Sequence, residues 1–104
     1  MLDKKHRLPK NINFRNIKAL SSKAFLVKIK KNEADIFRIG VIVSKKIDGR
    51  AVVRNKIKRQ IKNCAEKLVK ENKLIKDILI IAKKEALGKN NKEVEDQLKK
   101  LILR

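Results

Sequence analysis

The sequence predicts a single α+β domain with elements in the order α-β-β-(β)-α-β-α, where the strand in parentheses is short and has no fixed place. Three observations lead to this prediction. The chain has 104 residues, a length typical of one domain. Hydrophobic residues make up 42% of it, enough for a core without a disulfide or a metal. Their spacing changes between a period of two, typical of strands, and a period near 3.6, typical of helices.

The first 22 residues predict a basic arm followed by a short helix. Residues 1–10 are polar and basic, so we expect an extended arm there. Asn11 or Asn13 has the side chain of a helix N-cap. Either one would precede a short helix that ends at residues 21–22 and carries Ile12, Phe14, Ile17 and Leu20.

Two strands are predicted next, over residues 23–31 and 36–45. In the first, Phe25, Val27 and Ile29 occupy alternate positions, which is typical of a strand with one buried face. The second is apolar at nearly every position, which favours a central place in the sheet. Only a short polar segment separates the two, so we expect an antiparallel hairpin.

The second half of the chain predicts two helices around one buried strand. A loop over residues 46–50 leads into a long helix over residues 52–71. Its apolar residues recur every three or four positions and share one face: Val53, Ile57, Ile61, Cys64, Ala65, Leu68 and Val69. The apolar run at 77–82 predicts a buried strand, and residues 89–103 predict a last amphipathic helix.

Charge is the dominant feature of the composition. Thirty Lys and Arg oppose eleven Asp and Glu, which gives a formal net charge of +19. Residues 1–62 carry 19 basic and 4 acidic residues (net +15), and residues 63–104 carry 11 and 7 (net +4). This distribution favours an anionic partner, nucleic acid first, that contacts the first half of the chain. No apolar run is long enough to span a membrane, and the single Cys64 fits a reducing, cytoplasmic location.

Basic residues are densest between residues 44 and 62, where eight Lys or Arg face one acid, Asp48. On the predicted helix, Arg54, Lys58 and Lys62 form one stripe. Asn55, which carries an amide, and Arg59 form a second stripe beside it. Like charges at this spacing destabilise a helix slightly, and an anionic partner would offset that repulsion. A solvated helix face, or a membrane-surface or calmodulin-target-like helix, would carry similar charge.

The most specific stretch is residues 51–59, which read Ala-Val-Val-Arg-Asn-Lys-Ile-Lys-Arg. It resembles the signature of the bacterial ribonuclease P protein family, which reads Ala-Val, any residue, Arg-Asn-Arg, two residues, then Lys-Arg. Other stretches resemble the family in the same order along nearly the whole chain. They are Arg7-Leu8 followed by Phe14, Gly40, the Val-Ser-Lys-Lys run at 43–46 and the run at 78–83.

The resemblance implies a single-domain α/β sandwich with a left-handed β-α-β crossover, against the usual right-handed rule. It also implies the protein subunit of ribonuclease P, an endoribonuclease whose RNA subunit performs the chemistry and mainly holds the Mg²⁺. The protein itself would supply no catalytic residue and no metal ligand. Its partners would be the catalytic RNA and precursor tRNA, whose 5′ leader is removed, with no membrane and no obligate protein partner.

The resemblance divides the candidate site residues between two RNA contacts. Those toward the catalytic RNA are Lys45, Lys46, Arg54, Asn55, Lys56, Lys58, Arg59 and Lys62. Those toward the leader are Phe14, Lys18, Leu26, Lys28 and Ser44. From the residues alone, Phe14 is equally a core residue or a platform for a stacked base.

Four lysines depart from the family's pattern. Lys56 and Lys62 stand where the family has or often has Arg, so the bidentate fork of a guanidinium is lost. Lys18 and Lys28 stand where aromatic residues are frequent, so we expect leader binding to depend more on phosphate attraction. Two other readings of the same charge are a structural ribosomal protein and a nonspecific RNA chaperone.

Overall fold

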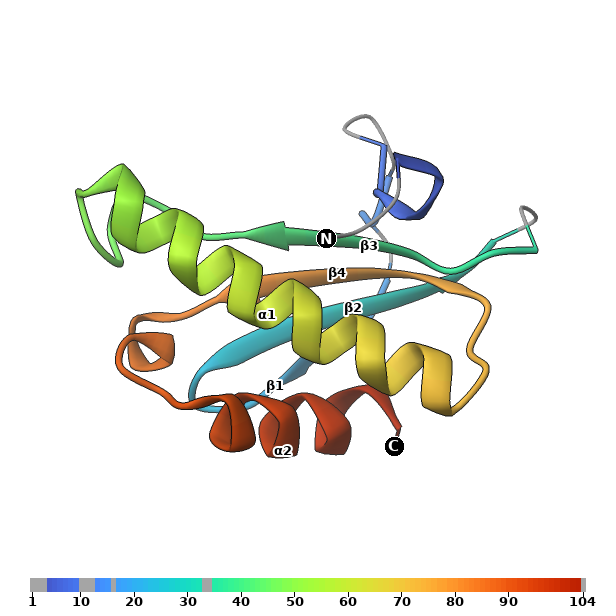
Figure 1. Ribbon diagram of the computed structural model, residues 1–104. Helices are drawn as coiled ribbons and strands as arrows, with labels where there is room; N and C mark the ends of the chain where they lie inside the picture. The colour runs from blue at the N-terminus through green and yellow to red at the C-terminus, as the bar shows by residue number, and fades with distance from the viewer. Residues whose placement is uncertain (1–3, 10–12, 16, 33–34, 104) are drawn as a thin grey trace.

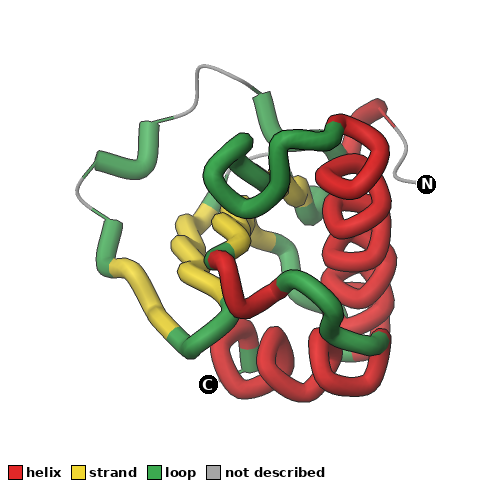
Figure 2. Tube along the Cα trace, turned by 90° about the vertical axis from the view of Figure 1, so that its left-hand side faces the viewer, coloured by secondary structure: helices red, strands yellow, loops and turns green. Residues whose placement is uncertain are grey.

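The computed structural model describes residues 4–9, 13–15, 17–32 and 35–103, so parts of the predicted arm and first helix lie outside it. The elements are, in order, η1 (Lys4–His6), β1 (Ala19–Ser21), β2 (Phe25–Lys31), β3 (Arg38–Ile42), α1 (Ala51–Glu71), β4 (Lys76–Ala82), η2 (Lys84–Ala86) and α2 (Asn91–Ile102). The strands form one mixed sheet in the order β1-β2-β4-β3. Both long helices cover the same face of that sheet (Figure 1; Figure 2).

The hydrophobic core fills the space between the sheet and these two helices. The strands contribute alternate residues, Phe25, Val27, Ile39, Val41, Ile78 and Ile80. α1 contributes most of the stripe predicted from its period, with Ile57, Ile61, Cys64, Ala65, Leu68 and Val69 buried. α2 contributes Val94, Leu98, Leu101 and Ile102. Both predicted helices and the strand at 77–82 are thus confirmed to within two residues at each end.

The two helices begin in different ways. α2 begins with a capping box, in which the Glu93 N–H donates to Asn90 Oδ1 (2.9 Å) and the Asn90 N–H donates to Glu93 Oε1 (3.2 Å). α1 has Arg50 at its N-cap, no side-chain cap and no acid in its first turn. The first turn of α1 therefore contributes no negative side chain of its own to offset the positive end of the helix dipole.

β3, α1 and β4 form a parallel unit whose crossover is left-handed. β3 pairs with β4 in parallel, with Ile39 opposite Ile78. In Figure 1 both strands run from right to left, β4 lies below β3, and α1 crosses in front. When the strands are turned to point up with α1 toward the viewer, β4 lies to the left of β3. This is the handedness that the family resemblance implied.

The predicted hairpin is wrong, because β4 lies between β2 and β3. β4 is antiparallel to β2 and parallel to β3, so β4 holds the central place and β3 lies at the edge. Beyond Arg38 the outer face of β3 is apolar too, and the N-terminal segment covers part of it, where Leu8 lies against Gly40. Ile42, beyond that cover, is 47% exposed. The extra short strand is β1, which precedes β2 and does not follow β3.

Among the described residues the predicted first helix is also wrong, and a turn and β1 stand in its place. Asn13 Oδ1 accepts a hydrogen bond from the Arg15 N–H (2.8 Å), which makes an Asx turn instead of a helix cap. Ala19 then lies opposite Lys28 in the antiparallel pairing of β1 with β2. Pairing with β2, the next strand in the sequence, outweighs the local helical pattern. Asn11 and Ile12 lie outside the described residues.

The N-terminal arm makes one 3₁₀ turn, η1, before it becomes extended. Arg7 then forms a parallel bridge with Ile39, and the Leu8 N–H donates to the Ile39 carbonyl (3.2 Å). The His6 ring stacks on Phe37 with centroids 3.9 Å apart, and His6 Nδ1 lies 2.8 Å from the Phe37 carbonyl oxygen. The arm thereby covers part of the β3 edge, which would otherwise offer unpaired backbone groups.

Candidate RNA-binding surfaces

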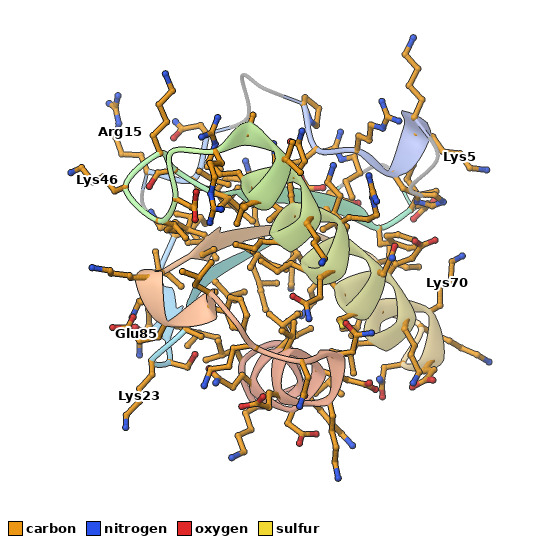
Figure 3. The ribbon with its side chains drawn as sticks, turned by 60° about the vertical axis from the view of Figure 1, so that its left-hand side comes forward. Lys5, Arg15, Lys23, Lys46, Lys70 and Glu85 are labelled. Carbon is orange, nitrogen blue, oxygen red and sulfur yellow. The ribbon has the colours of Figure 1, made fainter. Side chains whose placement is uncertain are left out.

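The outward side of α1 and the loop before it form one cationic surface. Asn55, Lys56 and Arg59 are exposed in the N-terminal half of α1. Lys45 and Lys46 are exposed in the loop between β3 and α1, and Figure 3 shows Lys46 projecting away from the body of the molecule. We call the following set the α1 face: Lys45, Lys46, Asn55, Lys56, Lys58, Arg59 and Lys62. The helical spacing thus brings together most of the residues predicted to contact the catalytic RNA.

Arg54 differs from the other predicted contacts because its guanidinium binds the protein. Its Nη1 donates to the carbonyls of Asp48 (3.1 Å) and Gly49 (2.8 Å). These bonds tie the loop before α1 to the first turn of the helix. Arg54 is half-buried, so its side chain supports the loop that carries Lys45 and Lys46 as well as adding positive charge.

Lys58 and Lys62 are half-buried, and Lys62 lies close to a cation that the sequence did not predict at this surface. Burial lowers the pKa of Lys62 from its usual value, and the positive charges of Lys58 and Arg7 lower that pKa further. Arg7 comes from the N-terminal arm, and only the pairing of the arm with β3 brings it here. A polyanion bound at this point would relieve the repulsion among the three cations.

Asp48 is the one acid within residues 44–62, and an arginine neutralises it. Arg50 donates from Nε to Oδ1 (3.0 Å), from Nη2 to Oδ2 (2.9 Å) and from its backbone N–H to Oδ1 (2.9 Å). These hydrogen bonds lower the pKa of Asp48 to about 2. The carboxylate therefore stays paired at neutral pH and does not oppose the approach of an anion to the α1 face.

A second candidate surface is the face of the sheet opposite the helices, here called the outer sheet face. Lys28 lies opposite Leu79 and Leu26 lies opposite Ile81, so these side chains share one face. Residues 13–15 and 17–18 pass on this side of the sheet, away from α1 and α2 (Figure 2). The structure thus places two of the predicted leader-binding residues, Leu26 and Lys28, on a surface that the helices do not cover.

Phe14 closes one side of a hollow of about 450 Å³ on the outer sheet face. The hollow is lined mainly by apolar side chains: Leu8, Pro9, Phe14, Val41, Ile42 and Leu79, with Gly40. Phe14 is 7% exposed and stands apart from the main core cluster. Lys18 and Ser44 are exposed outside the strands, Lys18 before β1 and Ser44 after β3. Because none of the described residues 13–15 and 17–18 is helical, Phe14 and Lys18 do not share the predicted helix face.

A buried ion pair at one end of the outer sheet face was not foreseen from the sequence. Arg38 donates from Nε and Nη2 to the two carboxylate oxygens of Asp77, both at 2.7 Å. Asn32 Nδ2 donates to Asp77 Oδ1 (2.9 Å) and to the Ile36 carbonyl (2.9 Å). The pairing with Asp77 raises the pKa of Arg38. The network joins β3, β4 and the segment after β2, and only the sheet register brings its members together.

Within the described ranges, no three His, Cys, Asp or Glu side chains gather where they could hold a metal ion. Asp48 and Asp77, two of the carboxylates near the candidate surfaces, are both bound by arginine. None of the helices in these ranges is both long enough and apolar enough to cross a membrane.

Sequence comparisons agree on one family. The sequence profile of the family Ribonuclease P matches residues 2–104. A curated protein of Bacillus cereus (strain Q1), the "Ribonuclease P protein component", is 41% identical over 102 residues, covering 93% of this chain and 88% of that one. The protein of the same name from Staphylococcus epidermidis is 36% identical over 106 residues, covering 97% and 90%.

Solved structures agree with the sequence comparisons. A Staphylococcus aureus RNase P protein mutant with defective mRNA degradation activity superposes with a TM-score of 0.77 at 33% identity, covering 96% of this chain and 87% of that one. The RNase P protein from Thermotoga maritima superposes with a TM-score of 0.73 at 28% identity, covering 91% and 93%. Sequence, fold and length therefore coincide, and the chain belongs to the ribonuclease P protein family, the protein components of a ribonuclease that processes tRNA.

Proposed function

We propose that this protein binds the catalytic RNA of ribonuclease P through the α1 face and assists removal of the 5′ leader from precursor tRNA. The observation that carries the proposal is the start of α1. Its first turn has no side-chain cap and no acid, the neighbouring Asp48 is paired with Arg50, and exposed cations lie in and before this turn in a chain of this family. Uncapped N–H groups, a helix dipole and exposed cations together match the phosphates of a folded RNA.

The outer sheet face is proposed to bind the single-stranded leader. It lies on the opposite side of the sheet from α1 and combines an apolar hollow with Lys28. Proteins bind single-stranded RNA in this way, because bases pack on apolar side chains while nearby cations bind the phosphates. Two surfaces on opposite sides would let one small protein contact the catalytic RNA and the leader at once.

The chemistry is proposed to belong to the RNA, which would also hold the Mg²⁺ ions. A protein with a net charge of +19 repels free divalent cations, whereas an RNA backbone attracts them. We expect protein freed of all RNA to leave precursor tRNA intact at physiological Mg²⁺. Specific 5′ cleavage by the RNA-free protein would contradict this assignment.

The contact with the catalytic RNA is tested by Arg59→Ala in the reconstituted complex. Arg59 is exposed, so the protein should fold normally and the RNA affinity should fall by about 1–3 kcal/mol. Lys99→Ala is the matched control, because Lys99 is exposed on α2, away from the α1 face. Equal affinities for the two variants would remove α1 from the interface.

The leader contact is tested by Lys28→Ala in the assembled holoenzyme. Binding of precursor tRNA with and without its leader is measured at several salt concentrations. The leader-dependent part should lose about 0.7 of its log–log salt slope for each phosphate contact removed. Lys28→Tyr should also flatten the slope but keep affinity at moderate salt, because a tyrosine stacks on a base. If Lys28→Ala leaves the leader-dependent part of precursor-tRNA binding unchanged, Lys28 does not contact the leader and is only a surface charge.

A further inference from the structure

A second hollow, of about 330 Å³, lies between the N-terminal half of α1 and the turn that follows η2. Val53 and Ile57 of α1 line it on one side, and Leu87 lines it on the other. Its volume is at the small end of the range of roughly 300–1,000 Å³ found for ligand sites. It is separate from the hollow at Phe14, which lies on the outer sheet face.

The lining combines aliphatic side chains with one amide. Leu87 is 44% exposed at the rim, although it is a large apolar residue in a strongly basic region. Gln60 Nε2 donates to the Lys89 carbonyl (2.8 Å) and to Asn91 Oδ1 (3.0 Å), which fixes the amide at the edge of the hollow. Among the described residues no donor reaches Gln60 Oε1, so that oxygen can accept a hydrogen bond from a ligand.

Two lysines of the hollow supply positive charge. Lys56 is exposed, and no carboxylate of the described residues lies within ion-pair distance of its Nζ. Lys89 forms an ion pair with Glu93 at 3.5 Å, long enough for a phosphate to compete for the ammonium group. Lys56 also belongs to the α1 face, so the hollow adjoins that face and an RNA bound there extends directly to it.

We propose that this hollow receives one unpaired nucleobase of the RNA that docks on the α1 face, with Lys56 and Lys89 binding the flanking phosphates. The inference rests on the proposed function. Aliphatic walls contact the two faces of an extruded base, as in other pockets for flipped bases. Gln60 Oε1 accepts from an exocyclic amine, which an adenine, a cytosine or a guanine carries.

The experiment is chemical probing of unpaired bases in the catalytic RNA, free and bound to the protein. The wild type should protect one unpaired base, and Leu87→Ala should restore the reactivity of that base alone. RNA affinity should fall roughly fivefold, the low end for a lost base contact. Ile75→Ala is the matched control, because Ile75 is a 51% exposed apolar residue outside the hollow. Thermal unfolding of both variants verifies their folding.

The outcomes separate this inference from the proposed function. If the complex forms but Leu87→Ala and Ile75→Ala give the same protection pattern and affinity, the hollow holds no base and the function still stands. If the protein protects only phosphates and paired regions of the RNA from the probe, the hollow again holds no base and the function still stands. If the protein forms no complex with the catalytic RNA, the proposed function and the inference fail together.

Discussion

Arginine side chains have two separate uses at the level of single residues. Arg38, Arg50 and Arg54 are bound by acceptors of the protein itself. Arg59 is exposed in the middle of the α1 face. A single arginine substitution can therefore affect either folding or RNA binding, and the hydrogen bonds of each side chain indicate which.

Arg54→Ala should lower the free energy of unfolding by about 1 kcal/mol, because the carbonyls of Asp48 and Gly49 lose a charged donor. The motif at residues 51–59 by itself predicts that the Arg54 side chain contacts only RNA. Urea unfolding followed by circular dichroism measures the effect, with Arg59→Ala as the control that should leave stability unchanged. Equal stability of both variants would show that the Arg54 bonds do not hold the loop.

Asp77→Ala should destabilise the protein far more, by about 3 kcal/mol. Asp77 is 1% exposed, and its removal leaves the Arg38 guanidinium without its partner. Removing one partner of a buried ion pair costs roughly 3–5 kcal/mol of stability. We expect the low end of that range here, because the Arg38 side chain is 23% exposed. Arg50→Ala, which breaks the exposed pair with Asp48, should hardly move the urea midpoint. Similar midpoints for the two variants would contradict the structural role of Asp77.

The N-terminal arm and β3 depend on each other at the level of elements. The arm covers the outer side of the edge strand, and β3 in turn places Arg7 near Lys62. This one pairing extends the positive stripe of α1 and closes the apolar hollow at Phe14, because Leu8 is part of its lining.

Gly40→Ala should loosen the arm without unfolding the core. A methyl group at residue 40 would lie 3.0 Å from Leu8 Cδ2 and 3.1 Å from Leu8 Cβ, so the arm must shift. Hydrogen exchange of the Leu8 amide, bonded to the Ile39 carbonyl, should become faster. Gly49→Ala is the control, since nothing lies within 4 Å of a methyl group there. Unchanged exchange at Leu8 would mean that the arm accommodates the methyl group.

For the whole molecule, the position of charge should matter more than its total. Lys45 and Lys46 are exposed beside α1, and Lys99 and Lys100 are exposed on α2. Replacing either pair with Gln lowers the net charge by the same two units. Only ions released from phosphate contacts contribute to the salt dependence of binding.

The double variant Lys45→Gln/Lys46→Gln should therefore reduce the log–log salt slope of catalytic-RNA binding by roughly 0.7–0.9 per lost contact. Lys99→Gln/Lys100→Gln should leave that slope within error of the wild type. Filter-binding titrations at several salt concentrations give both slopes. Identical slopes for the two double variants would indicate diffuse attraction by the net charge instead of contacts at the α1 face.

The sequence by itself determined the family, the two long helices, the buried strand at 77–82 and the cationic side of α1. These features depend on local periodicity, because an apolar stripe that repeats every 3.6 residues fixes which side of α1 meets the core and which side meets solvent. The motif at 51–59 then placed Asn55, Lys56 and Arg59 on the outward side, where the structure has them. The left-handed crossover came from the resemblance and not from the pattern.

Only the tertiary structure decided the order of the strands and the groups that this order brings together. A period of two identifies a strand but does not say which strand lies beside it, so β4 between β2 and β3 could not be read from spacing. The Arg38–Asp77 pair and the covered edge of β3 follow from that register. The turn at Asn13 has the same cause, since the residues after it gain more by pairing with β2 than by forming a short helix.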